Sequence, residues 1–126
     1  MAVPVSHPRR VSLVERHRLT EGLRTGIVAE AGLVAHGRGE ALDYLLGERT
    51  TLHAAAAEKA AVAALLSAEN PVISINGNVA ALCPREAVKL AELTGSRLEV
   101  NLFYRTLERE EKIRGVLLAA GAKKVY

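Results

Sequence analysis

Along the chain, the spacing of apolar side chains changes from a helical period to a strand period near the middle. The first predicted helix begins at the capping box Ser12-Leu13-Val14-Glu15, where a serine stands three residues before a glutamate, and it ends at Gly26. Residues 29–35 fit either a short helix or an apolar approach to a loop. Residues 52–69 are dense in alanine and predict a further helix. Its predicted buried stripe consists of Val62, Leu65 and Leu66.

Beyond Asn70-Pro71, which closes that helix, short strands alternate with helices. The predicted strands are 72–75, 97–102 and 123–126. Pro84 begins one intervening helix, which Gly95 ends, and Thr106 caps the next, which Gly121 ends. The buried face of this last helix is predicted to carry Ile113, Val116, Leu117 and Ala120. Strand–helix–strand alternation predicts an α/β fold with a parallel sheet and right-handed crossovers.

The segment from His36 to Glu48 is rich in polar residues and glycine. Arg38 stands between Gly37 and Gly39, so a planar cation suited to phosphate or carboxylate is flanked by residues that allow close backbone approach. We expect a functional loop here, followed by a helix from Glu40. The buried side of that helix is expected to carry Leu42, Leu45 and Leu46.

Composition narrows the classes of function. With 126 residues the chain is one domain at most, and its net charge of +3 favours anionic ligands only slightly. Cys83 is the only cysteine, which fits a reducing cytoplasm. No apolar run reaches the ~18 residues of a membrane span, and Met1–Arg10 lacks the apolar stretch of a signal peptide. Aromatic residues are only 3% and basic residues are not clustered, which argues against nucleic acid.

Two polar segments follow the predicted strands, where ligands bind in open parallel sheets. Asn76-Gly77-Asn78 follows the first strand and can either cradle an anion or form a simple turn. Asn101 and Arg105 lie at the end of the second strand, and Arg105 can add a charged contact. No dinucleotide fingerprint or P-loop is present in the sequence.

Other polar side chains permit two interpretations each. From the sequence alone, Arg16 is a solvated surface residue by default, whereas Arg38 between glycines favours a ligand. His36 fits a structural hydrogen bond better than acid–base chemistry. Glu40 and Asp43 can either hold Mg²⁺ beside a phosphate or complement a helix start. The histidines lack metal-ligand spacing, so no protein metal site is predicted.

Long stretches of the sequence resemble archaeal phosphopantothenate synthetase, the 4-phosphopantoate–β-alanine ligase family. The amino-terminal motifs are Ser6-His7-Pro8-Arg9, Ser12-Leu13, Arg16, residues 31–41, Asp43-Tyr44-Leu45 and Gly47-Glu48. The later motifs are Asn70-Pro71-Val72, residues 76–82 and residues 99–106. The resemblance runs almost from end to end of the chain.

The resemblance implies an ATP-dependent ligase of coenzyme A biosynthesis with a Rossmann-like fold and a homodimeric assembly. Such enzymes join 4-phosphopantoate to β-alanine and release AMP and pyrophosphate, with Mg²⁺ expected on the ATP phosphates. The ATP-binding arginines of the family fall on Arg16 and Arg38, which replaces the surface interpretation of Arg16. Asn76, Gly77, Asn78, Asn101 and Arg105 are predicted, from strand-end position alone, to bind substrate.

Family members are about twice this long, so the resemblance implies the first half of a Rossmann-like domain. We expect an N-terminal helical segment over residues 1–53 that contains the His36–Glu40 loop, and a βαβαβ unit over residues 54–126. The sheet edge beyond the last strand is expected to be open and prone to aggregation. The alternative function is a non-catalytic nucleotide-binding or dimerisation half of a split or truncated ligase.

Overall fold

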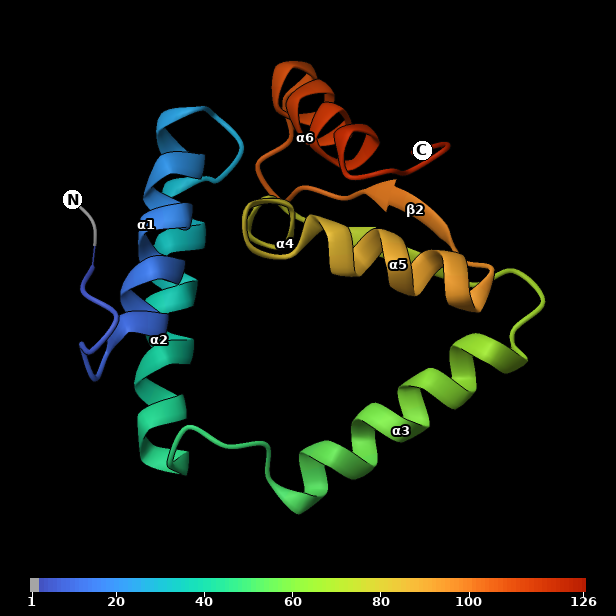
Figure 1. The fold of residues 1–126 in the computed structure, drawn as a ribbon. Helices are drawn as coiled ribbons and strands as arrows, with labels where there is room; N and C mark the ends of the chain where they lie inside the picture. The colour runs from blue at the N-terminus through green and yellow to red at the C-terminus, as the bar shows by residue number, and fades with distance from the viewer. Residues whose placement is uncertain (1–2) are drawn as a thin grey trace.

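The computed structural model describes residues 3–126 and has a mixed α/β fold with six helices and a two-stranded parallel sheet. Figure 1 shows two amino-terminal helices standing beside the α/β unit, with the third helix crossing below it. Met1 and Ala2, the first residues of the segment that argues against a signal peptide, lie outside the described residues. The predicted boundary between residues 53 and 54 stays a prediction. Within residues 3–126, no helix combines the length and apolar character needed to cross a bilayer.

The first helix, α1 (Arg10–Arg24), begins two residues before the predicted capping box. That prediction was wrong, because the Ser12 hydroxyl lies inside the helix and donates to the Arg9 carbonyl at 3.2 Å instead of capping the terminus. The predicted end is confirmed, since Gly26 follows the last turn with a φ of 80°. Leu19 is completely buried on the side of α1 that faces the rest of the molecule.

The predicted loop around Arg38 is wrong: α2 (Glu30–Leu46) is continuous through it. Gly37 and Gly39 are therefore interior helix residues, and Gly47 ends the helix in the left-handed conformation. The helix also has no buried residue, so the prediction that its leucines form a buried side is wrong as well. These residues, Leu42, Leu45 and Leu46, are exposed by 57%, 85% and 46%.

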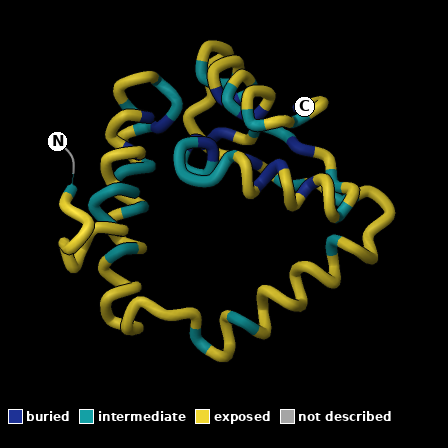
Figure 2. The backbone as a smooth tube through the Cα atoms, in the orientation of Figure 1, coloured by how far each residue is buried: buried dark blue, intermediate teal, exposed yellow. Residues whose placement is uncertain are grey.

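The alanine-rich helix α3 (Leu52–Ser67) forms as predicted, with the Thr51 hydroxyl accepting from the Ala54 amide at 3.2 Å. Its predicted buried stripe is wrong, because α3 has no buried residue. Figure 2 shows the helix as an almost wholly exposed segment extending below the α/β unit. Alanine propensity therefore accounts for this helix better than tertiary burial does.

The sheet consists of β1 (Val72–Ile75) and β2 (Arg97–Val100), paired in parallel with Ile75 opposite Val100. The second strand is two residues shorter than predicted. Between the strands lie α4 (Gly77–Leu82) and α5 (Pro84–Thr94), and α6 (Leu107–Ala119) follows. The predicted start and end of α5 and the Thr106 cap of α6 are confirmed.

The core lies between the sheet and the helices α5 and α6. Ile75, Ile113 and Leu117 are at most 1% exposed, which confirms the predicted inner face of α6. The predicted third strand is not assigned as one. Nevertheless, the Tyr126 amide donates to the Leu98 carbonyl and the Val100 amide donates to the Tyr126 carbonyl, both at 2.9 Å. These two bonds follow the parallel ladder pattern, so Tyr126 pairs with β2.

Candidate functional site at the carboxyl ends of the strands

A cavity of about 500 Å³ opens at the carboxyl end of the sheet, where α2, α4 and the start of α6 meet. Its polar lining residues are Arg38, Asn76, Asn78, Tyr104 and Arg109. The remaining lining residues are glycines and apolar residues, including the aromatic Phe103, and none is a carboxylate. The cavity therefore combines a volume typical of small-molecule sites with a positive charge, and we call it the strand-end pocket.

Asn76-Gly77-Asn78 lines this pocket as a helix start and not as a simple turn. The Asn76 side chain caps α4 by accepting from the Val79 amide at 3.0 Å. Asn78 reaches α2, where its amide nitrogen donates to the Gly32 carbonyl at 2.9 Å. At Gly77, an added Cβ would lie 2.3 Å from the Ile27 carbonyl oxygen, so only glycine permits this close approach. The segment thus fastens α2 and the preceding loop to the sheet.

Arg38 extends from α2 into the same lining and is an exposed residue. In the part of the chain that the structure describes, its guanidinium makes no hydrogen bond or ion pair. The sequence predicts a ligand-binding Arg38 in a loop, whereas the structure places it on a helix at the pocket. Its charge is therefore available to an anion.

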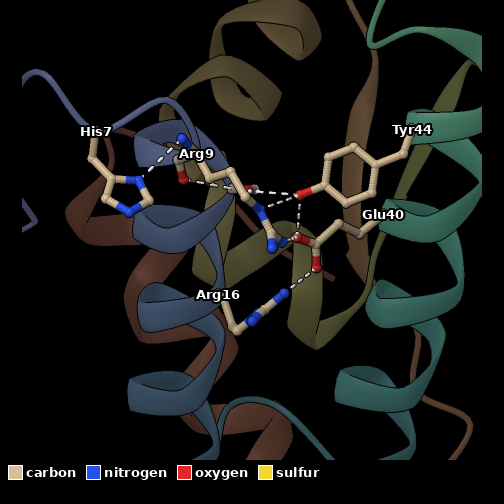
Figure 3. Close-up of polar contacts among 6 residues, drawn as sticks. His7, Arg9, Arg16, Glu40 and Tyr44 are labelled. Atoms are coloured by element: carbon tan, nitrogen blue, oxygen red, sulfur yellow. Dashed lines mark hydrogen bonds and ion pairs between the residues drawn. The ribbon is translucent and has the colours of Figure 1, made fainter.

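Arg16 lies away from this pocket, in a polar network between α1 and α2 (Figure 3). Its Nη2 donates to Glu40 Oε2 at 2.6 Å, and Arg9 Nη2 donates to Glu40 Oε1 at 3.0 Å. The Tyr44 hydroxyl donates to Glu40 Oε1 at 2.8 Å, and its oxygen lies 3.2 Å from the Ser12 hydroxyl oxygen. We call the four residues Arg9, Arg16, Glu40 and Tyr44 the interhelical network.

The carboxylate of Glu40 is the centre of that network. Its side chain is only 10% exposed, and its hydrogen bonds to Arg16, Tyr44 and Arg9 lower its pKa to about 2. Glu40 is thus fully ionised at neutral pH and bound to two cations. The helix-start interpretation is wrong, because Glu40 lies in the interior of α2, whereas its role as a Mg²⁺ ligand stays a prediction. Arg9 also lies over the Tyr44 ring, 5.1 Å from its centroid.

A second cavity of about 550 Å³ adjoins the network and differs in charge from the strand-end pocket. Glu15, Asp43 and Glu48 line it together with Glu40, and His36 contributes a buried Nε2 without a partner. Excess negative charge makes this cavity a poor place for ATP or a phosphorylated acid. Across residues 3–126, no three side chains of His, Cys, Asp or Glu are grouped to share a metal ion.

Three further sequence candidates lie outside the strand-end pocket. Arg105 pairs with Glu110 at 2.9 Å and is 70% exposed, and Asn101 is exposed on the way to α6, so strand-end position did not bring them to the ligand cavity. Cys83 is half-buried between α4 and α5. Burial, followed by the charge of Glu86, raises the pKa of its thiol, so the thiol is inert at neutral pH.

Arg109 is the pocket residue that sequence reasoning missed. It lies in the first turn of α6, where its amide donates to the Thr106 cap at 3.2 Å. The available signal was the rule already used for Asn76, because α6 begins at the same edge of the sheet where β1 and β2 end.

Known proteins are similar to this chain along nearly its whole length. Residues 53–126 match the profile of the phosphopantothenate/pantothenate synthetase family. A 4-phosphopantoate–beta-alanine ligase of Methanosarcina mazei is 56% identical over 123 residues, covering 98% of this chain and 49% of the relative. The ligase of the same name from Thermococcus onnurineus is 58% identical over 111 residues, covering 88% of this chain and 42% of the relative. The chain spans about half the length of the curated relatives it matches, and it belongs to the phosphopantothenate/pantothenate synthetase family.

Proposed function

We propose that this chain forms the strand-end pocket of an ATP-dependent ligase that condenses (R)-4-phosphopantoate with β-alanine to 4′-phosphopantothenate, in coenzyme A biosynthesis. The observation that carries the proposal is a cavity at the carboxyl end of a parallel sheet that is lined by Arg38 and Arg109 and by no carboxylate. Both phosphorylated substrates of this reaction are polyanions. A site that holds them together needs positive charge to offset their repulsion.

The proposed reaction has two steps. A carboxylate oxygen of 4-phosphopantoate attacks the α-phosphorus of ATP, forming an acyl adenylate as the bond to pyrophosphate breaks. The amine of β-alanine then attacks the acyl carbon, loses a proton and displaces AMP. The chain contributes by placing carboxylate and phosphorus side by side, which supplies much of the rate in reactions of this type.

We assign Arg38 to the ATP phosphates and Asn76, Gly77 and Asn78 to 4-phosphopantoate. Asn76 and Asn78 each use one side-chain atom in the fold, which leaves donors and acceptors for a ligand. Arg16 is a second candidate for ATP. Its side chain is 48% exposed and donates once to Glu40, so further N–H groups are free to bind a phosphate.

Magnesium fits this site as a partner of the nucleotide and not of the protein. The strand-end pocket offers amide and carbonyl groups but no carboxylate in its lining, so we assign Mg²⁺ to the ATP phosphates, where it would neutralise charge at the attacked phosphorus.

We further propose a homodimer, supported by the exposed leucines of α2 and the unburied helix α3. Dependence on ATP and the single thiol favour the cytoplasm.

Isothermal titration and pyrophosphate release test this function. We expect ATP and 4-phosphopantoate each to bind, and pyrophosphate to appear when β-alanine is added. Arg38→Ala should weaken ATP binding roughly 10-fold or more without changing the melting temperature, because a contact between charged groups is lost. The matched control is Arg49→Ala, which removes an exposed arginine outside the pocket lining.

Three outcomes separate the possibilities. Binding of both phosphorylated substrates with pyrophosphate release supports the ligase. Nucleotide binding without release supports the alternative, a non-catalytic half. No binding of either substrate at millimolar concentration contradicts the proposed function.

A further inference from the structure

Arg109 is a partly buried cation without a counter-charge. Its Nη2 donates to the Ile27 carbonyl at 3.1 Å, and its Nη1 donates to the Tyr104 carbonyl. Both acceptors are neutral, and no carboxylate of residues 3–126 lies within ion-pair distance of it. The arginines nearest to it in sequence differ, because Arg105, just before α6, pairs with Glu110, and Arg114, on α6, pairs with Glu111. The charge of Arg109 alone is left uncompensated within this group of three arginines.

The hydrogen-bond donors of Arg109 are also only partly used. A guanidinium carries five N–H groups, of which two are bound here. The Nε–H is shielded from solvent and has no partner. Leaving such a donor unsatisfied is unfavourable, so its presence beside a cavity requires an explanation. A bound anion that neutralises the guanidinium supplies one.

The position of Arg109 makes such an anion accessible. It lines the strand-end pocket together with Arg38, and the cavity, at about 500 Å³, lies within the range of small-molecule sites. Because Arg38 extends from α2 and Arg109 from α6, the two cations belong to different walls of the pocket. Two guanidinium groups and no carboxylate match a ligand that carries a charge of about −2, such as a terminal phosphate.

The mouth of the pocket indicates what the phosphate is attached to. Phe103 is 100% exposed and Tyr104 is 60% exposed, and their ring centroids lie 6.0 Å apart. Both residues line the pocket, and the Tyr104 carbonyl is one of the two acceptors of Arg109. Covering a fully exposed phenylalanine with an apolar group lowers the free energy, so the site suits a phosphate that is attached to an organic group.

We propose that Arg109 is a substrate-binding residue that, with Arg38, holds the terminal phosphate of a phosphorylated substrate in the strand-end pocket. This inference rests on the proposed function and adds to it the residue that recognises the phosphate. Bonds to the Ile27 and Tyr104 carbonyls hold the guanidinium in place, so phosphate binding requires little further ordering of this side chain.

The test compares ligands with and without the phosphate. The unaltered chain, Arg109→Gln and Arg109→Lys are titrated calorimetrically with 4-phosphopantoate, ATP and pantoate, which lacks the phosphate. We expect Arg109→Gln to weaken binding of a phosphorylated ligand roughly 10- to 100-fold and to leave pantoate binding within about twofold. Arg109→Lys keeps the charge but loses the planar guanidinium, so its affinity for the phosphorylated ligand should lie between those of the unaltered chain and of Arg109→Gln. The matched control is Arg105→Gln, in the same segment but outside the pocket lining.

A measurement on the unaltered chain covers the case in which these variants do not fold. With ¹⁵N-labelled arginine, NMR should show the Arg109 Nε–H signal shifting on titration with the phosphorylated ligand and staying in place with pantoate. The ligand that loses more affinity in Arg109→Gln, ATP or 4-phosphopantoate, identifies the source of the phosphate.

The outcomes distinguish the two proposals. If the unaltered chain binds a phosphorylated ligand and Arg109→Gln binds it equally well, the assignment of Arg109 is wrong and the proposed function stands. Equal weakening of pantoate and 4-phosphopantoate also overturns the assignment, because Arg109 is then only a structural tether. If the unaltered chain binds no phosphorylated ligand, the proposed function fails and this inference fails with it.

Discussion

Replacing Glu40 with glutamine tests whether the interhelical network stabilises the packing of α2 on α1. The substitution keeps the shape of the side chain and removes the charge that Arg9 and Arg16 contact at 3.0 and 2.6 Å. The Tyr44 hydroxyl can still donate to the amide oxygen. The perturbation therefore isolates the ionic part of the network.

The size of the effect follows from the pKa of Glu40. Its fall from 4.5 to about 2 corresponds to at most ~3.4 kcal/mol, at about 1.36 kcal/mol for each unit. Both arginine side chains are about half exposed, at 49% and 48%, so solvent screens the pairs. We therefore expect Glu40→Gln to lower the free energy of unfolding by about 1–2 kcal/mol at pH 7, which is roughly 4–8 °C in melting temperature.

The pH dependence has a definite sign. The folded-state pKa is depressed, so the stabilisation is present above pH 4.5 and disappears as the pH falls toward 2. Urea unfolding of both proteins, followed by circular dichroism between pH 2.5 and 7, measures the difference. Arg24→Gln, which removes an exposed pair within α1, is the control and should change stability by less than ~0.5 kcal/mol. A Glu40→Gln difference that is absent at pH 7, or that stays constant down to pH 2.5, refutes the reasoning.

Two glycine substitutions test the helix and the pocket separately. Gly37→Ala should raise the free energy of unfolding by about 0.5–1 kcal/mol, because a Cβ at this position meets no atom within 4 Å. The control Gly115→Ala in α6, where a Cβ is equally free of contacts, should raise it by the same amount. If thermal melts show a loss of stability for Gly37→Ala alone, α2 is not continuous. Gly77→Ala should cost about 2 kcal/mol or more, since its Cβ would lie 2.3 Å from the Ile27 carbonyl oxygen. A Gly77→Ala protein that melts like the unaltered chain contradicts the close approach of α4 to the loop after α1.

The elements that the sequence predicted well have strong local signals. Pro84 begins α5 and Gly95 ends it in the left-handed conformation, while the Thr106 side chain caps α6. Each signal acts within one turn of helix and so can be read without knowledge of the fold. Ser12 carried the same kind of signal and failed, because the helix begins at Arg10 and leaves the serine in its interior.

The predicted loop at Arg38 was wrong because contacts between residues distant in sequence stabilise the helix there, and local sequence rules do not include such contacts. Two interior glycines cost a helix about 2 kcal/mol, which favours a loop when residues 36–48 are considered alone. In the structure, Glu40 accepts from Tyr44 one turn later and from Arg16 on α1, 24 residues earlier in the chain. Such contacts add stability across the glycines. They depend on the packing of α1 and α2, which sequence spacing does not reveal.

The two arginines that the family resemblance assigns to ATP lie on different sides of α2. Arg38 and Glu40 are two residues apart, so their side chains leave the helix about 200° apart. Glu40 faces α1 and holds Arg16, while Arg38 lines the strand-end pocket. The ionic contacts on one side of α2 therefore set the rotation of the helix that carries the pocket cation on the other. Asn78 fixes the same helix from the sheet through the Gly32 carbonyl. In this arrangement the network positions Arg38 by fixing the rotation of α2.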